Sequence, residues 1–159
     1  MFDFDGVLSD GRVITLSDGD QLRSTNVKDG YALQLALKKG LRVVVLSGGY
    51  SESMKKRYAT FEGMEILLGV SNKIQRFREY LAANNISAEE VLYMGDDIPD
   101  YEVMSEVGLS ACPADAAVEI KNMADYISFA GGGQGCVRDV IEQVLRAQDK
   151  WFNEGCFHW

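Results

Sequence analysis

Short apolar runs alternate with segments of helical spacing along most of the chain. The run from Arg42 to Leu46 is short and rich in β-branched valine, which is typical of a strand buried on both faces of a parallel sheet. Similar runs predict strands over residues 65–68, 91–94, 108–111 and 126–129. The intervening segments predict helices over residues 29–39, 72–83, 99–106, 114–123 and 135–147. This alternation predicts an α/β fold, a Rossmann-like three-layer α/β/α sandwich with a mostly parallel sheet.

Two segments fall outside that alternation. Val13 to Val27 contains a polar turn, Ser17 to Asp20, between two arms of alternating polarity, and therefore predicts a β-hairpin flap over about residues 12–27. Residues 150–159 are rich in aromatic side chains but have no clear period, so we interpret them as a C-terminal tail of a single domain over residues 1–149. Because only two residues precede Asp3, where the first strand is expected to end, we expect the natural chain to extend before Met1.

Charge and cysteine usage narrow the function classes. The formal net charge of −8 argues against nucleic acid and anionic membranes as partners, because both are bound by basic surfaces. Three widely spaced cysteines and one histidine do not form a zinc or disulfide pattern, which favours free thiols in a reducing cytoplasm. No apolar run approaches the roughly 20 residues that span a bilayer, and no leader sequence is visible.

Polar residues follow the predicted strands at the point where each strand ends. In open α/β sheets, ligands bind at the carboxyl ends of the strands, so these residues are the candidates for a site. They are Asp3, Asp5, Ser47, Gly48, Lys73, Asp96 and Asp97, with Asp100 one helical turn further on.

The chemistry of these residues points to a metal and a phosphate. Asp3 and Asp5 are two positions apart, so on a strand both would face the same way, and Asp96 and Asp97 would bring four carboxylates to one sheet edge. Carboxylates placed together repel unless a cation is shared, and Mg²⁺ is the hard cation that prefers oxygen ligands. Lys73 and the Ser47 hydroxyl would then supply donors to phosphate oxygens, which predicts magnesium-dependent phosphoryl transfer with a carboxylate as nucleophile.

The ordered set of Asp3-Phe4-Asp5-Gly6-Val7, Ser47, Lys73 and Gly95-Asp96-Asp97 resembles the four motifs of the haloacid dehalogenase superfamily. The resemblance implies Asp3 as nucleophile, which becomes phosphorylated, and Asp5 as general acid and base. It implies that Ser47 binds the phosphoryl group and that Lys73 balances charge. It further implies a Mg²⁺ site formed by Asp3, the Asp5 carbonyl and Asp96, with Asp97 acting through water, while Asp100 orients Lys73.

Spacing and further motifs indicate a subgroup. Only 25 residues separate Ser47 from Lys73, and about 40 separate the first two motifs, which leaves no room for a cap domain. The segment Asn26 to Tyr31 and the loop Gly131 to Gly135 resemble the capless 3-deoxy-D-manno-octulosonate 8-phosphate phosphatases of lipopolysaccharide precursor synthesis. That resemblance implies a homotetramer built through the hairpin, with active sites at subunit interfaces. It also implies that Ser47, Gly48, Lys28 and Arg57 bind the sugar-acid phosphate.

Alternatives remain open at this stage. A related family acts on the nine-carbon acid, 2-keto-3-deoxynononate 9-phosphate, and carries an acidic residue where this chain has Gly49, which favours the eight-carbon substrate. Gln134 stands where the glycine loop of the family normally carries a basic residue. Similar domains also serve as non-catalytic oligomerisation modules, although a scaffold has no use for four converging carboxylates.

Overall fold

A parallel sheet forms the centre of the molecule in the computed structural model, which describes residues 1–158. Phe2 bridges in parallel to Val45 on one side and to Met94 on the other, and so joins the two halves of the sheet in the order β4-β3-Phe2-β5-β6-β7. The predicted first strand is therefore reduced to this single residue. The other strands are β3 (Val44–Leu46), β4 (Glu65–Leu67), β5 (Leu92–Met94), β6 (Leu109–Cys112) and β7 (Tyr126–Ile127).

The backbone around Phe2 is hydrogen-bonded to β3 on one side and to β5 on the other. Its amide donates to the Val44 carbonyl at 2.9 Å, and its carbonyl accepts from the Leu46 amide at 2.9 Å. The amide of Asp3 then donates to the Met94 carbonyl at 2.9 Å. Asp3 thus leaves the sheet between β3 and β5, the two strands that precede the second and fourth motifs.

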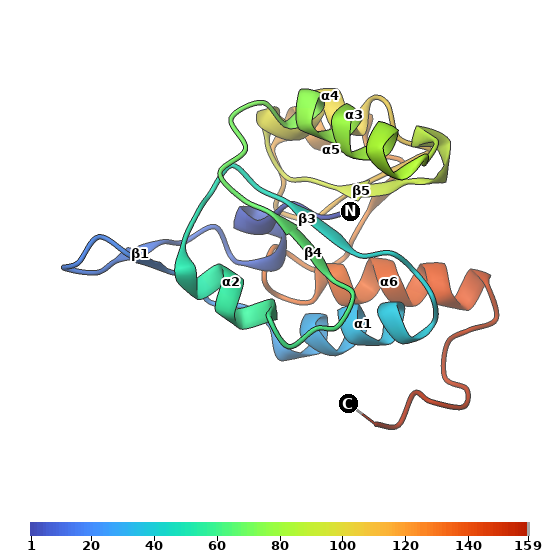
Figure 1. Cartoon of the computed structure of the whole chain (residues 1–159). Helices are drawn as coiled ribbons and strands as arrows, with labels where there is room; N and C mark the ends of the chain where they lie inside the picture. Colours follow the sequence, from blue (N-terminus) through green and yellow to red (C-terminus); the bar gives the residue numbers. More distant parts are fainter. Residues whose placement is uncertain (159) are drawn as a thin grey trace.

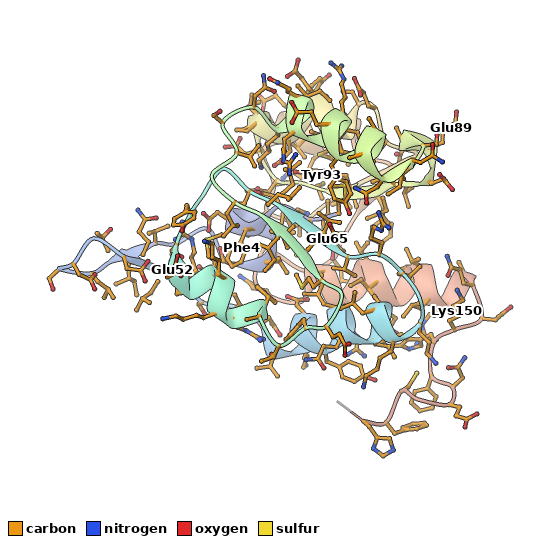
Figure 2. All side chains as sticks on the ribbon, viewed as in Figure 1. Phe4, Glu52, Glu65, Glu89, Tyr93 and Lys150 are labelled. Carbon is orange, nitrogen blue, oxygen red and sulfur yellow. The ribbon has the colours of Figure 1, made fainter. Side chains whose placement is uncertain are left out.

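Helices cover both faces of the sheet, which confirms the predicted three-layer α/β/α sandwich (Figure 1). One apolar cluster contains Phe4 and residues of α1 and α6, and a second contains Tyr93 and residues of α3, α4 and α5. Figure 2 shows these two aromatic side chains in the two different layers. The helices are α1 (Val27–Lys38), α2 (Glu52–Tyr58), α3 (Lys73–Asn84), α4 (Tyr101–Met104), α5 (Val118–Met123) and α6 (Cys136–Ala147).

Two predicted helices are shorter than expected. The helix predicted over 99–106 is a 3₁₀ turn, Ile98–Asp100, followed by the single turn of α4. The helix predicted from residue 114 begins only at Val118, because the Ala117 amide donates to the Asp96 carbonyl at 2.8 Å instead of entering a helix. Both departures lie beside the fourth motif, where long-range contacts override local preference.

The predicted hairpin is present and extends away from the sandwich (Figure 1). β1 (Ile14–Thr15) pairs antiparallel with β2 (Gln21–Leu22), and the Leu16 amide donates to the Asp20 carbonyl at 2.8 Å to close the turn. Ile14 is 65% exposed at its outer surface. The hairpin therefore offers apolar side chains to solvent in the single chain.

The C-terminal tail folds back onto α1 and α6 of the same chain. The Tyr31 hydroxyl donates to the Cys156 carbonyl, and Lys39 Nζ donates to the Glu154 carbonyl at 2.6 Å. The Arg138 guanidinium lies 4.5 Å from the centre of the Trp151 ring. Within residues 1–158, no helix combines the length and apolar character needed to cross a membrane.

Asp29 connects the two helices that contact each other most extensively. It lies in the first turn of α1, is 1% exposed, and accepts a 2.6 Å hydrogen bond at Oδ1 from the Arg138 amide in the first turn of α6. Gly135, at the start of α6, has no side chain to cap the helix, so Asp29 does so from a neighbouring element. Its Oδ2 has no hydrogen-bond partner among the described residues, and burial raises the pKa of Asp29 to about 6.

Asp29 should therefore make the free energy of unfolding depend on pH. Because its pKa is higher in the folded chain than in the unfolded chain, the folded state loses stability as pH rises from about 4 to about 6, by an amount on the order of 3 kcal/mol. Asp29→Asn should remove this part of the slope in denaturant titrations between pH 4 and 7. Asp18→Asn, at the exposed hairpin tip, should keep the wild-type slope; an unchanged slope in Asp29→Asn would contradict the assignment.

Candidate active site

The first motif leaves the sheet in a turn that brings it close to the fourth. After Asp3 the chain forms a turn over Phe4–Leu8, closed by a 2.9 Å hydrogen bond from the Ser9 amide to the Phe4 carbonyl. Gly6 has a φ of +91°, and a Cβ placed there would lie 2.0 Å from Asp96 Oδ2. Glycine is thus required both by the backbone conformation and by the approach of the Asp96 carboxylate.

Three carboxylates meet at this edge of the sheet. Oxygens of Asp3, Asp96 and Asp100 lie within 4.8 Å of one another, and Asp3 and Asp100 are buried. Lys73 Nζ, at the start of α3, contacts Asp3 Oδ1 at 2.8 Å and Asp100 Oδ1 at 2.7 Å. The Tyr93 hydroxyl also donates to Asp100 Oδ1, at 2.6 Å. Asp100 thus belongs to the carboxylate cluster as well as holding Lys73.

One ammonium group does not balance three carboxylates. Burial raises the pKa of Asp3 to about 6, with repulsion from Asp100 adding to the rise and Lys73 opposing it. Burial likewise raises the pKa of Asp96 to about 8, and Asp3 and Asp100 contribute further repulsion. Burial alone would lower the pKa of Lys73, but the two carboxylates that it contacts raise it. The cluster therefore has an excess of negative charge, and its all-oxygen donor set fits Mg²⁺.

The second motif lies next to the first. Ser47 follows β3 and is buried, its amide donates to the Leu67 carbonyl at 2.9 Å, and its Oγ accepts from the Gly49 amide at 3.1 Å. A Cβ on Gly49 would lie 2.9 Å from Asp5 Oδ2 and 3.4 Å from Ser47 Oγ. The Ser47–Gly49 loop and Asp5 therefore border the same small space.

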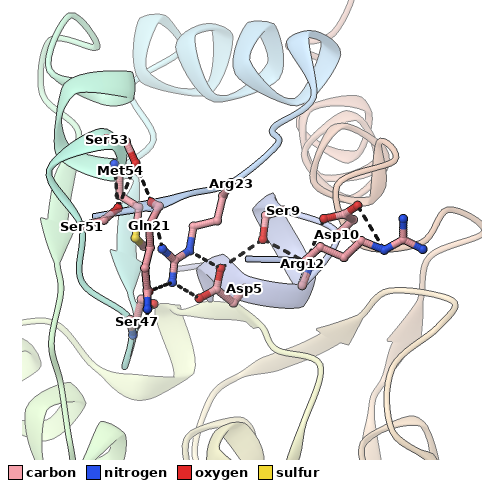
Figure 3. Close-up of polar contacts among 12 residues, drawn as sticks. Asp5, Ser9, Asp10, Arg12, Gln21, Arg23, Ser47, Ser51, Ser53 and Met54 are labelled. Carbon is pink, nitrogen blue, oxygen red and sulfur yellow. Dashed lines mark hydrogen bonds and ion pairs between the residues drawn. The ribbon is translucent and has the colours of Figure 1, made fainter. Parts of the chain in front are cut away.

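Asp5 does not face the way that the strand argument predicted. The chain has already turned at this residue, so the expectation that Asp3 and Asp5 share one face of a strand was wrong. The Asp5 carboxylate accepts from Arg23 Nε at 2.8 Å, from Arg23 Nη2 at 2.9 Å and from Ser9 Oγ at 3.2 Å (Figure 3). Arg23 was not singled out from the sequence, where the only signal was a basic residue within the second arm of the predicted hairpin.

The other residues predicted for the site are not part of the three-carboxylate cluster. Asp97 is exposed and caps the following turn by accepting from the Ile98 amide at 2.8 Å. Arg57 Nε donates to Thr25 Oγ1 at 3.2 Å, and its guanidinium stacks over aromatic rings of its own chain. Gly48, Lys28 and Gln134 are exposed.

Comparison with known proteins identifies relatives across most of the chain. Residues 50–130 match the model of the haloacid dehalogenase-like hydrolase family. The chain is 39% identical to the 3-deoxy-D-manno-octulosonate 8-phosphate phosphatase of Salmonella typhi over 150 residues, which cover 94% of this chain and 80% of that protein.

Solved structures of similar proteins have the same fold. The Yersinia pestis 3-deoxy-D-manno-octulosonate 8-phosphate phosphatase gives a TM-score of 0.90 at 36% identity, covering 94% of this chain and 80% of that one. The Moraxella catarrhalis phosphatase, solved with a magnesium ion, a phosphate ion and a KDO molecule, gives 0.90 at 29% identity, covering 94% and 86%.

The charge imbalance predicts that Mg²⁺ stabilises the folded chain. At a free Mg²⁺ concentration about 100 times the dissociation constant, the gain should be about 2.7 kcal/mol, measured as a rise in the unfolding midpoint of chelator-treated protein. Asp96→Asn should abolish most of this rise, because it removes one of the three converging carboxylates. Glu119→Gln, an exposed acidic residue on α5, is the control; a full Mg²⁺ response in Asp96→Asn would exclude Asp96 as a ligand.

Proposed function

The chain belongs to the haloacid dehalogenase-like hydrolases, and on this basis we propose that it is a magnesium-dependent phosphatase acting on 3-deoxy-D-manno-octulosonate 8-phosphate. The products are the free sugar acid and phosphate, and the step belongs to lipopolysaccharide precursor synthesis. Support comes from relatives of that activity at 39% identity over 94% of the chain. The structural observation that carries the proposal is Lys73 bonded to Asp3 and Asp100 within a cluster of three carboxylates.

The residues act in two successive steps. A carboxylate oxygen of Asp3 attacks phosphorus, the bond from phosphorus to the sugar oxygen breaks, and Asp5 gives its proton to the departing oxygen. Asp5 then takes a proton from a water molecule, which attacks phosphorus and releases phosphate from Asp3. Lys73 holds Asp3 Oδ1 in place and offsets negative charge. The Ser47 hydroxyl donates a hydrogen bond to the phosphoryl group.

The Mg²⁺ ligands that we propose are those that the family resemblance implies. Asp3 and Asp96 would provide carboxylates, Asp5 would provide its backbone carbonyl, and Asp97 would act through water. Bound Mg²⁺ supplies the positive charge that lets an anionic carboxylate approach an anionic phosphate. A non-catalytic scaffold would leave the repulsion among these carboxylates without a purpose, which is why we do not favour that alternative.

Substrate selection involves residues around the cluster. We assign Ser47 and Gly48 to the phosphoryl end, and Lys28 and Arg57 to the sugar acid, with Arg57 reaching from a neighbouring subunit. A homotetramer in the cytoplasm is the assembly we propose, and the exposed hairpin side chains of Val13, Ile14 and Leu22 are available for it. Gly49 favours the eight-carbon acid over the nine-carbon 2-keto-3-deoxynononate 9-phosphate.

Asp3→Asn should abolish turnover, because an amide does not attack phosphorus. We expect less than about 1% of wild-type kcat on the eight-carbon sugar-acid phosphate in the presence of Mg²⁺. Asp10→Asn, an exposed acid in the adjacent segment, controls for a general effect of charge and should stay close to wild type. Activity of Asp3→Asn above that level would refute covalent catalysis by Asp3.

Arg57→Ala should weaken recognition of the substrate carboxylate. The KM for the sugar-acid phosphate should rise on the order of 10-fold, the loss expected for one charge-assisted hydrogen bond, while a small aryl phosphate is spared. An equal loss on the aryl phosphate would remove Arg57 from the sugar-acid site.

Steady-state kinetics of the wild-type protein on phosphates of the eight- and nine-carbon acids should show the higher kcat/KM for the eight-carbon acid. Preference for the nine-carbon acid would overturn the substrate assignment.

A further inference from the structure

Arg23, at the base of the hairpin, bonds to Asp5, the residue expected to transfer the proton. It follows β2 directly, its side chain is only 4% exposed, and the Asp5 side chain is 30% exposed. Two nitrogens of the guanidinium meet the two oxygens of the carboxylate, at 2.8 and 2.9 Å (Figure 3). This paired geometry fixes the plane of the carboxylate as well as its position.

Asp5 needs such a partner because its backbone does not orient it. It lies in a turn rather than in a paired strand, and its φ and ψ of −78° and 117° are followed by the left-handed Gly6. Ser9 Oγ donates to the same Oδ1 at 3.2 Å but does not reach the second oxygen within hydrogen-bond distance. Arg23 alone among the described contacts holds both oxygens.

Arg23 is itself held in place by Gln21 of β2, and Gln21 in turn accepts a hydrogen bond from α2. Its Nη1 donates to the Gln21 carbonyl at 3.3 Å, and its Nη2 donates to Gln21 Oε1 at 3.1 Å. The same Gln21 carbonyl accepts from Ser53 Oγ at 2.9 Å, and Ser53 contacts Ser51, which caps α2. The base of the hairpin, the helix after the second motif and Asp5 therefore form one hydrogen-bonded network (Figure 3).

The network places Asp5 at the loop where phosphate is expected. A Cβ on Gly49 would lie 2.9 Å from Asp5 Oδ2 and 3.1 Å from Arg23 Nη2. We propose that Arg23 is the positioning residue of this site: it holds the ionised Asp5 carboxylate beside this loop, and when Asp5 carries a proton Arg23 keeps its bond to Oδ1, so that the protonated Oδ2 faces the oxygen that leaves phosphorus. The inference rests on the proposed phosphatase function and adds to it a role for the hairpin base within each subunit.

The leaving group provides a test that a structural role would not affect. Proton donation matters for an alcohol, which leaves poorly as an alkoxide, and matters little for a nitrophenolate, which leaves as a stable anion. Since kcat/KM reports steps up to the first irreversible one, it isolates phosphoryl transfer to Asp3 from the later attack of water. Three substrates separate the explanations: the sugar-acid phosphate, a neutral-sugar phosphate without a carboxylate, and p-nitrophenyl phosphate.

Arg23→Ala should lower kcat/KM about 10- to 100-fold on both sugar phosphates, which is a part of what general acid catalysis contributes. On p-nitrophenyl phosphate it should lower kcat/KM less than about 3-fold. Arg23→Lys should recover part of the loss because it keeps the charge but not the fork. Combined with Asp5→Asn, Arg23→Ala should cause no additional loss on the sugar phosphates, because it acts through Asp5. Arg78→Ala, which breaks an exposed ion pair with Glu106, is the matched control and should behave like wild type on all three.

Each contrary outcome has a distinct meaning. Equal losses of kcat/KM on all three substrates, with an unchanged unfolding midpoint, would overturn the positioning role. A loss confined to the sugar-acid phosphate would overturn it as well, by assigning Arg23 to the substrate carboxylate. If Arg23→Ala does not fold, the same comparison is made with Arg23→Lys. Absence of turnover by the wild type on every substrate would overturn the proposed function, and this inference with it.

Discussion

The gathering of three carboxylates around one lysine is the constraint that organises this molecule. Burying like charges together is unfavourable, and the raised pKa values of Asp3 and Asp96 are the consequence. The fold nevertheless brings the ends of three segments to one edge of the sheet, where the carboxylates meet. Phe2, paired between β3 and β5, places Asp3 at their centre. A divalent cation resolves the imbalance.

Two glycines are as important to this arrangement as the charged side chains, because a Cβ at either position would clash with a carboxylate residue. A Cβ on Gly6 would lie 2.0 Å from Asp96 Oδ2, and a Cβ on Gly95 would lie 2.4 Å from the Asp100 Cβ. Gly6 lets the first motif approach the fourth, and Gly95 lets the Asp100 side chain pack against the backbone of the fourth motif. The hairpin adds a further charged pair, Arg23 with Asp5, next to the Ser47–Gly49 loop.

Local patterns predicted the sandwich because each of its elements carries its own signal. The valine-rich run at β3 and the helical spacing at α1, α3 and α6 match the structure to within a few residues. The two failures have different causes. Asp5 lies in a turn that the Asp5-Gly6 pair indicates locally but that the strand argument did not take into account, whereas α5 starts late because of a long-range hydrogen bond from Ala117 to the fourth motif.

In the candidate site, too, some residues could be predicted from the sequence and others could not. Asp3, Lys73 and Asp96 were predicted because a parallel sheet brings successive strand ends to one edge. Arg23 was not, since its partner lies 18 residues away across a hairpin whose direction no sequence pattern specifies. The close approach of Asp100 to Asp96 depends likewise on the space above Gly95.

We propose that buried acidic groups share a cation and that one of them, Asp3, carries the phosphoryl group for part of each turnover. Rapid acid quenching during turnover of the sugar-acid phosphate with Mg²⁺, followed by mass spectrometry of the peptide that contains Asp3, measures this directly. A phosphoryl group should appear on Asp3 and should form and decay at least as fast as turnover. Steady turnover with Asp3 unmodified, or with the phosphoryl group on another residue, would contradict it.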